Sequence, residues 1–257
     1  MKFGKNRKTG LALGGGAVLG AAHIGVIRAM EEYEIKVTHV AGTSIGAFVA
    51  SFVAFGKGWE EMMEIGKELK WIDISGISLS RFALLSNDKL GDLIKKHIGD
   101  KDIEDADIPL AMVATDIESG DKVVLKKGSV AEAVMASTCI PGIFKPVKMD
   151  GKLLVDGGVV ENVPLPTLKD LGAKKMIGVD LNAQHSYGKP ENILDVILNS
   201  YHYTMRAVAE LQKEEADLII DPDLSDFNRS NMRQVKKLME VGYRDAKKIL
   251  SREFKKS

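Results

Sequence analysis

The sequence predicts an α/β protein in which helices cover both faces of a mostly parallel central sheet. Segments with the pattern of buried strands alternate with helical segments along most of the 257 residues. Residues 110–114 are continuously apolar, as expected for a strand that is covered on both faces. Two glycine-rich turns, at residues 14–20 and 42–46, each join an expected strand directly to an expected helix. We therefore expect a three-layer α/β/α arrangement with additional C-terminal helices.

Two strand–turn–helix units open the chain. Thr9–Leu13 is a short apolar strand, and its glycine turn leads into a helix from about Gly20 to Tyr33. Val37–Ala41 is a second strand, followed by a tight turn and an apolar helix, Ala47–Phe55. A basic start before an apolar run is also the outline of a signal peptide, but three consecutive glycines interrupt that run. We therefore expect both units to belong to the folded domain.

The remaining strands follow a helical and irregular region, Lys57–Asp107. They are apolar segments bounded by turn residues: Ile108–Asp116, Asp121–Lys126, Lys152–Val155, Lys175–Leu181 and Leu218–Ile220. The first two are expected to form a hairpin around a Glu-Ser-Gly turn. Helices are expected after Pro164 and, as two long ones, from Glu191 onward. We expect one domain over residues 1–257, with a core at about 11–182 and a helical extension at about 191–257.

Composition excludes several classes of protein. The 36 Lys and Arg residues balance 36 Asp and Glu residues, which argues against a nucleic-acid-binding protein. The hydrophobic content of 45% is too high for a disordered chain, and no window is long and apolar enough to span a membrane. Cys139 is the single cysteine, and no Cys/His cluster has metal-ligand spacing, so we expect no disulfide within the chain and no zinc site. A cytoplasmic location is the expectation that fits these features.

The turn Gly42-Thr43-Ser44-Ile45-Gly46 carries a candidate nucleophile. It has the G-x-S-x-G pattern and lies between a strand and a helix, where the serine is lifted above the sheet edge. The flanking glycines relieve clashes, and the following helix directs N–H groups toward the serine oxygen. The alternative is that Ser44 merely caps the helix in a glycine-rich turn.

The glycines at Gly14, Gly15, Gly16 and Gly20 predict an anion-binding loop. Glycines let backbone N–H groups converge on an anion without obstruction by a Cβ atom. A dinucleotide-binding turn is the rival hypothesis, but the G-x-G-x-x-G spacing fails and no acidic residue ends the second strand. Beside a candidate nucleophile, an oxyanion hole is the better interpretation.

Asp156-Gly157-Gly158 provides a candidate base at the end of a later strand. An acid in this position can present its carboxylate at the same sheet edge as Ser44. The alternative is an ordinary Asp-Gly turn, which is common. Asp156 is therefore a candidate catalytic base only in combination with Ser44 and the glycine loop.

In these three motifs the sequence resembles the patatin-like phospholipases. The resemblance is collinear from about Leu11 to Asn182, and 114–116 and 136–146 resemble two further segments of the family. It implies a serine lipid acyl hydrolase of phospholipase A or carboxylesterase type, which acts on acyl esters through a Ser44–Asp156 dyad and an acyl-enzyme. The implied oxyanion donors are in Gly14, Gly15, Gly16 and Ile45. No metal, no cofactor and no catalytic histidine are implied.

Leu19 departs from the family pattern, which usually has Arg or Lys at this position. The alternative function is therefore a catalytically weak lipid-binding or regulatory protein that retains the fold. The order of Asp156, His185 and His202 along the chain also leaves a Ser-His-Asp triad open. We favour the dyad, because His185 lies past a strand in a polar loop and His202 falls inside an expected helix, whereas Ser44 and Asp156 lie at strand ends.

Two regions beyond the motifs carry hypotheses about lipid contact. The segment from Trp59 to Leu85 is rich in Met and aromatic residues and could form the wall or lid of an acyl-chain site, although a plain helical core is the alternative. From Asn231 to Ser257 there are nine Lys and Arg residues against three acidic ones. Such a basic amphipathic helix can lie on an anionic membrane, or it can simply pack on the domain with a solvated basic face.

Overall fold

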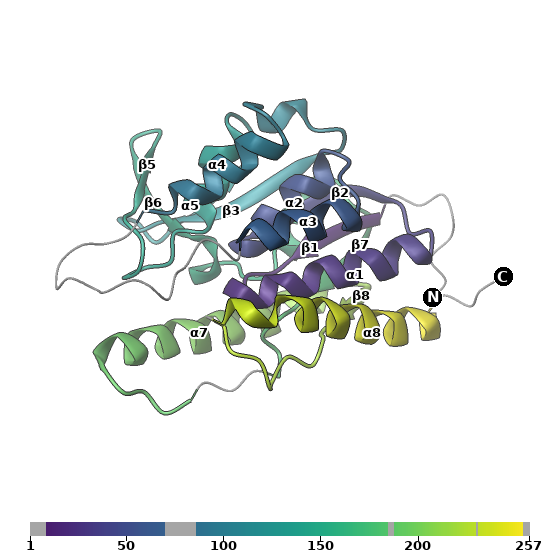
Figure 1. Ribbon diagram of the computed structural model, residues 1–257. Coiled ribbons are helices and arrows are strands. Elements are labelled where there is room, and N and C mark those ends of the chain that lie inside the picture. Colours follow the sequence, from purple (N-terminus) through teal and green to yellow (C-terminus); the bar gives the residue numbers. More distant parts are fainter. Residues whose placement is uncertain (1–8, 70–85, 185–187, 230, 254–257) are drawn as a thin grey trace.

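The computed structural model describes residues 9–69, 86–184, 188–229 and 231–253. Its centre is an eight-stranded sheet with the order β5-β6-β3-β2-β1-β7-β8, in which β4 pairs with β3 (Figure 1). The strands are β1 (Thr9–Leu13), β2 (Val37–Thr43), β3 (Leu110–Asp116), β4 (Lys122–Leu125), β5 (Val147–Met149), β6 (Lys152–Asp156), β7 (Lys175–Val179) and β8 (Leu218–Ile220). The pairs among β3, β2, β1, β7 and β8 are parallel, whereas β4, β5 and β6 pair antiparallel.

Helices form a layer on each side of the sheet. They are α1 (Ala21–Glu32), α2 (Ile45–Ala54), α3 (Trp59–Leu69), α4 (Asp88–His97), α5 (Val130–Ser137), α6 (Leu165–Asp170), α7 (Ile193–Gln212) and α8 (Val235–Glu253). Alternate residues of one strand enter different cores: Leu11 and Leu13 join the larger one and Ala12 the smaller one. The larger core includes residues of α1, α2, α5 and α8, and the smaller one includes residues of α6 and α7. The predicted three-layer fold with a mostly parallel sheet is confirmed.

The long C-terminal helix α8 packs along α1, and both lie on the same side of the sheet (Figure 1). The helices cross at Gly25 and Gly242, where a Cβ atom would lie 2.0 Å and 2.2 Å from carbonyl oxygens of the facing helix. Leu238, Ala246 and Leu250 are buried on the apolar face of α8. Packing rather than solvent therefore covers the apolar stripe that the sequence shows in this helix.

Two elements escaped the sequence prediction. Helix α5 begins after Ser129, whose hydroxyl accepts a hydrogen bond from the Glu132 N–H, and β5 is a three-residue strand. Such a short strand carries no periodicity of its own and exists only through its pairing with β6. The region 57–107 contains α3 and α4, in agreement with the helical region predicted there. Of the segment predicted as a wall or lid, Trp71, Phe82, Leu84 and Leu85 lie outside the described residues. No helix in the described ranges combines the length and apolar character needed to cross a membrane.

Candidate active site

Ser44 occupies a strained turn between β2 and α2. Its backbone has φ 55° and ψ −130°, a conformation that is costly for a residue other than glycine. The backbones around it are packed so closely that a Cβ atom at Gly46 would lie 2.0 Å from the Leu13 carbonyl oxygen. At Gly42 it would lie 2.4 Å from the Gly46 carbonyl oxygen, so neither glycine can be replaced without moving the turn. The Ser44 N–H donates to the Ser137 hydroxyl at 2.9 Å, which helps to hold the strained residue in place.

The register of the sheet brings Asp156 to Ser44. Strand β2 pairs with β3 up to Thr43 and Val113, and β6 pairs with β3 from Asp116 back to Ala114, which lies opposite Asp156. Because β4 occupies the other edge of β3, β2 and β6 lie along the same edge and end facing each other. The sequence interpretation placed both residues at one sheet edge. The structure shows that opposed strand ends, rather than parallel ones, bring them together.

The carboxyl group of Asp156 is almost completely buried, at 1% exposure. Its Oδ1 accepts a hydrogen bond from the Gly158 N–H at 2.8 Å, while Oδ2 has no partner within hydrogen-bond distance among the described residues. Burial raises the pKa of Asp156 to about 6, and the hydroxyls of Ser44 and Tyr201 and the Gly158 N–H lower that pKa in part by stabilising the charged form. The carboxylate is therefore a stronger base than an exposed one and has an oxygen free to accept a proton. Gly157 packs on the β3 backbone beside it.

Helix α7 contributes Tyr201, which the sequence analysis did not single out. A Cβ atom at Gly158 would lie 2.7 Å from the Tyr201 hydroxyl and 3.1 Å from Asp156 Oδ1, so this hydroxyl lies near the Asp156 carboxyl group. Burial and the Asp156 charge raise the pKa of Tyr201 well above its ordinary value, so the phenol keeps its proton. No local motif marks this residue, because the contact joins segments 45 residues apart and depends on where α7 packs.

Among the described residues, the groups that stabilise the charged Asp156 carboxyl group are Ser44, Gly158 and Tyr201, and none is a histidine. His202 Nδ1 lies 3.3 Å from a guanidinium nitrogen of Arg229. His185 lies outside the described residues. Burial lowers the pKa of His23 to about 4, so the ring is neutral at pH 7 and donates from Nε2 to the Gly14 carbonyl oxygen at 2.8 Å. His23 thus supports the glycine loop by a hydrogen bond.

The glycine loop between β1 and α1 lies over Ser44. The Gly14 N–H donates to the Val179 carbonyl oxygen at 3.0 Å, and the Gly15 N–H is shared between the carbonyl and side-chain oxygens of Asn162 at 3.3 Å and 3.2 Å. Within the described part of the chain, the N–H groups of Gly16 and Ile45 have no such partner. A Cβ atom at Gly15 would lie 3.1 Å from the Ser44 Cβ atom, which shows how closely the loop approaches the serine.

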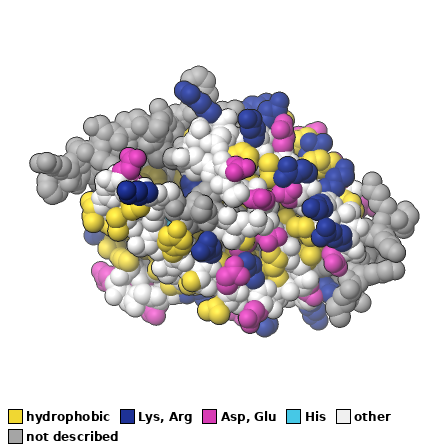
Figure 2. Space-filling model, turned by 90° about the horizontal axis from the view of Figure 1, so that it is seen from below, with side chains coloured by type: hydrophobic (Ala, Val, Ile, Leu, Met, Phe, Trp, Pro, Cys, Tyr) yellow, Lys and Arg dark blue, Asp and Glu magenta, His cyan; other side chains and the backbone are white. Residues whose placement is uncertain are grey.

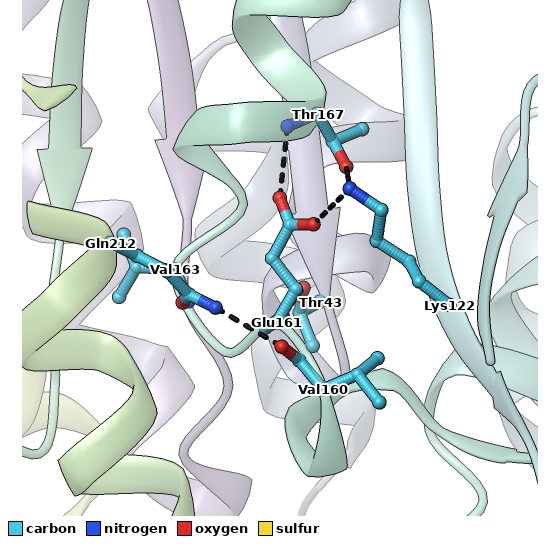
Figure 3. Close-up of polar contacts among 7 residues, drawn as sticks. All are labelled: Thr43, Lys122, Val160, Glu161, Val163, Thr167 and Gln212. Atoms are coloured by element: carbon cyan, nitrogen blue, oxygen red, sulfur yellow. Dashed lines mark hydrogen bonds and ion pairs between the residues drawn. The ribbon is translucent and has the colours of Figure 1, made fainter. Parts of the chain in front are cut away.

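An ion pair between the buried Glu161 and the partly exposed Lys122 holds the segment that follows Asp156 (Figure 3). Glu161 is 2% exposed, pairs with Lys122 Nζ at 2.6 Å and accepts the Thr167 N–H at 2.9 Å. Its carbonyl oxygen accepts the Thr43 hydroxyl at 2.8 Å, next to Ser44. Gln212, near the C-terminal end of α7, donates to the Val160 carbonyl oxygen at 3.2 Å. These contacts tie β2, β4, α6 and α7 to the loop that contains Asn162, and they were not anticipated from the sequence.

An apolar cavity of about 270 Å³ opens at Ser44. It extends along α2 past Phe48 and Phe52 to Met62, Ile65 and Gly66 of α3. Part of the predicted wall, in α3, thus lines the cavity. The side chain of Leu19 is completely buried in the larger core and does not line the cavity.

Cys139, the single cysteine, is buried near Asp156. Burial and the Asp156 charge raise the pKa of the Cys139 thiol to about 12, so it stays protonated and unreactive. Its Sγ donates to the Lys145 carbonyl oxygen at 3.2 Å. In the described ranges, no group of three or more His, Cys, Asp and Glu residues is arranged to hold a metal ion.

The same arrangement of sheet and helices occurs in solved structures. VipD from Legionella pneumophila covers 96% of this chain with a TM-score of 0.62, over 67% of its own length and at 16% identity. ExoU in complex with SpcU, from Pseudomonas aeruginosa, covers 97% with a TM-score of 0.51, over 52% of its own length and also at 16% identity. At this level of identity the likeness concerns the fold alone.

The sequence comparison defines the family. The model of the patatin-like phospholipases matches residues 11–169, more than half of the chain, and the protein therefore belongs to the patatin-like phospholipase family. An uncharacterized NTE family protein from Mycobacterium tuberculosis is 34% identical over 184 residues, which is 70% of this chain and 50% of that protein. The human patatin-like phospholipase domain-containing protein 6 is 32% identical over 184 residues, 68% of this chain and 13% of that protein. A lysophospholipase, nte1, from Emericella nidulans is 31% identical over 210 residues, 76% of this chain and 14% of its own. The chain thus spans half or less of the length of these relatives.

Proposed function

We infer that the protein is a lipid acyl hydrolase of the phospholipase A or carboxylesterase type, with Ser44 as nucleophile and Asp156 as general base. The observation that carries this proposal is a serine in a strained turn, beside a buried carboxyl group with a raised pKa, at the opening of an apolar cavity. A general base is most effective when its pKa lies near the working pH. The names of the human and Emericella relatives, a phospholipase-domain protein and a lysophospholipase, support an acyl-ester lipid as substrate.

The mechanism follows from the two side chains. Asp156 accepts the proton of the Ser44 hydroxyl as its oxygen attacks the ester carbonyl, and the N–H groups of Gly16 and Ile45 stabilise the oxyanion. Gly14 and Gly15 shape the loop, since their own N–H groups are engaged within the protein. Asp156 then returns the proton to the leaving alkoxide. It accepts another proton from the water that hydrolyses the acyl-enzyme and passes it to the Ser44 oxygen as the acyl–oxygen bond breaks.

The cavity supports an apolar acyl chain as the group that is bound next to Ser44. Its lining is almost entirely aliphatic and aromatic, with few polar side chains such as Asn87 and Thr138. Chain burial in such a cavity is favourable by roughly 0.8 kcal/mol for each methylene group. The wall that α3 forms over the cavity is thus part of the proposed substrate site.

We further propose that the protein reaches a lipid substrate by peripheral contact of α8 with the membrane surface. Lys236, Lys237, Arg244, Lys248 and Arg252 are exposed on this helix. Figure 2 shows the underside of the molecule, with hydrophobic side chains gathered on the side of α7 and basic and acidic side chains interspersed on the side of α8. Because the apolar face of α8 is buried on α1, such contact would be electrostatic and not insertion of the helix.

Enzyme assays on single variants test the dyad. Ser44→Ala is expected to abolish hydrolysis of p-nitrophenyl esters and phospholipids, together with labelling by a fluorophosphonate probe. Asp156→Asn should lower kcat by about 10³-fold or more, as removal of a base does in other serine hydrolases. His202→Ala and His185→Ala should each stay within about tenfold of the parent. A folded histidine variant as inactive as Ser44→Ala would replace the dyad by a triad.

Leu19 favours a second candidate function, a lipid-binding protein with little turnover. The chain lacks the usual cation at this position, yet it keeps the apolar cavity. The two functions differ in the fluorophosphonate experiment, because a binding protein would take up fatty acid without labelling of Ser44.

A further inference from the structure

Arg229, in the segment between β8 and α8, contacts the glycine loop directly through its backbone and indirectly, through Asn182, with its side chain. Its carbonyl oxygen accepts the Val18 N–H at 3.1 Å. Its guanidinium group donates to the Asn182 side-chain oxygen and approaches His202. Its charge also acts on Tyr201, next to Asp156. Residues 14–20 carry no charged side chain of their own, so Arg229 brings a positive charge to this loop.

Asn182 transmits this contact to the loop. It is 1% exposed, and its Nδ2 donates to the Gly15 carbonyl oxygen at 2.8 Å. The orientation of an amide side chain is set by its partners, because the oxygen accepts and the nitrogen donates. Arg229 can only donate, so its contact with the Asn182 oxygen turns the amide nitrogen toward Gly15.

The Gly15 carbonyl group belongs to the same peptide unit as the Gly16 N–H. A hydrogen bond to that carbonyl fixes the plane of the peptide and polarises it, which strengthens the N–H as a donor. The Gly15 N–H is held separately by Asn162. The hydrogen bonds from Arg229 to Asn182 and from Asn182 to Gly15 therefore run in one direction and end at the group proposed to meet the oxyanion.

We propose that Arg229 is a positioning residue for the oxyanion hole, acting through Asn182 to orient and polarise the Gly15–Gly16 peptide. The proposal rests on the proposed hydrolase function. Because Arg229 is proposed to make no contact with the substrate, it should stabilise the transition state and should not change the affinity for the substrate.

The test is steady-state kinetics of Arg229→Met with a p-nitrophenyl ester. Direct loss of an oxyanion donor costs about 10²–10³-fold in kcat, and an indirect contribution should cost about 10–100-fold with KM within about twofold. Arg233→Met removes the same charge from an exposed side chain nearby and should leave both constants within about twofold. A change in KM alone, or an equal loss in Arg233→Met, would overturn the proposal.

A double-variant cycle tests the route through Asn182. If Arg229 acts through this amide, Arg229→Met should cost little more when Asn182→Ala is already present. Additive losses would overturn the relay. Arg229→Gln keeps a donor for Asn182 without the charge, so it serves if Arg229→Met does not fold, with an expected loss of about tenfold in kcat. Arg229→Gln with parent-like kcat would likewise overturn the proposal. An inactive parent protein would instead contradict the proposed function itself.

Discussion

At the scale of single residues, the site combines groups that are obvious in the sequence with groups that are not. Ser44, Asp156 and the glycines belong to local motifs, because the tight turns that present them need particular neighbours in sequence. Tyr201, Asn162, Asn182 and Arg229 act on the same few atoms from distant segments. Nothing in their own surroundings in the sequence distinguishes them, so only the packing of α7 and of the loops after β6, β7 and β8 identifies them.

Tyr201→Phe should move the acidic limb of the pH profile. Loss of the hydroxyl removes a group that stabilises the Asp156 carboxylate, so the pKa of Asp156 should rise further above about 6. Hydrolysis needs the charged carboxylate, and the midpoint of the limb in kcat/KM should therefore shift upward by about 0.5–1 pH unit. Tyr203→Phe, on the exposed side of the same helix, is the matched control. An unchanged limb in Tyr201→Phe would show that the phenol does not influence the base.

At the scale of secondary structure, sequence patterns predicted every strand of the described residues except β5, but they did not predict the direction of β6. Strands β1, β3 and β7 are buried along their length, β2 is buried from His39 onward, and all four are mainly apolar, so their composition marks them. The antiparallel direction of β6 depends on the path of the chain after α5, which composition does not encode. That direction is what places Asp156 opposite Ser44.

Helix α3 should control the length of the acyl chain that is accepted. Among the residues that the structure describes, a Cβ atom at Gly66 would meet only Ile24 within 4 Å, at 3.6 Å, which leaves room in the cavity for a larger side chain. Gly66→Leu should fill that room and also favour the helix by roughly 1 kcal/mol. We expect kcat/KM to fall about tenfold for long-chain p-nitrophenyl esters and by less than about twofold for the butyrate.

The control for this change is Glu64→Leu, which adds the same side chain to the exposed face of α3. It should leave the ratio of long-chain to short-chain activity as in the parent. Equal losses for all esters in Gly66→Leu would mean that the acyl chain does not enter this end of the cavity.

Helix α8 should attract the protein to anionic membranes without inserting. Each Lys or Arg near such a surface contributes about 1 kcal/mol, and this attraction is screened by salt. Replacement of Lys236, Lys237 and Lys248 by Glu should abolish sedimentation with phosphatidylserine vesicles at low salt. The matched control replaces the exposed Lys126 and Lys127 by Glu and should preserve most of the binding. Equal binding to neutral vesicles would rule out the electrostatic contact.

At the scale of the whole molecule, the site is maintained at a cost to the stability of the fold. Ser44 holds a strained backbone conformation, and Asp156 holds a buried charge at neutral pH. Burial acts in the opposite sense on His23, whose lowered pKa means that stability is lost as the pH falls from about 6.5 toward 4. The packing of sheet and helices keeps both side chains buried. The rest of the folding free energy must therefore offset the cost of a charged Asp156 and of a neutral His23 at low pH.

Asp156→Asn should therefore stabilise the protein while it removes activity, and the gain should depend on pH. The pKa of Asp156 is about 6 in the folded protein against 3.8 in the unfolded chain. Below about pH 4 both states are protonated and the charge costs nothing, whereas above about pH 6 the folded state carries the full cost, on the order of 3 kcal/mol. In urea unfolding, the stability of Asp156→Asn relative to the parent should thus rise between pH 4 and pH 6.5 and then level off.

Ser44→Ala should show the opposite slope, because it retains the carboxylate and removes a hydroxyl that stabilises the charge. A stability difference for Asp156→Asn that is the same at pH 4 and pH 7 would mean that the pKa of Asp156 is not raised by folding, and the basis for its role as a desolvated base would be lost.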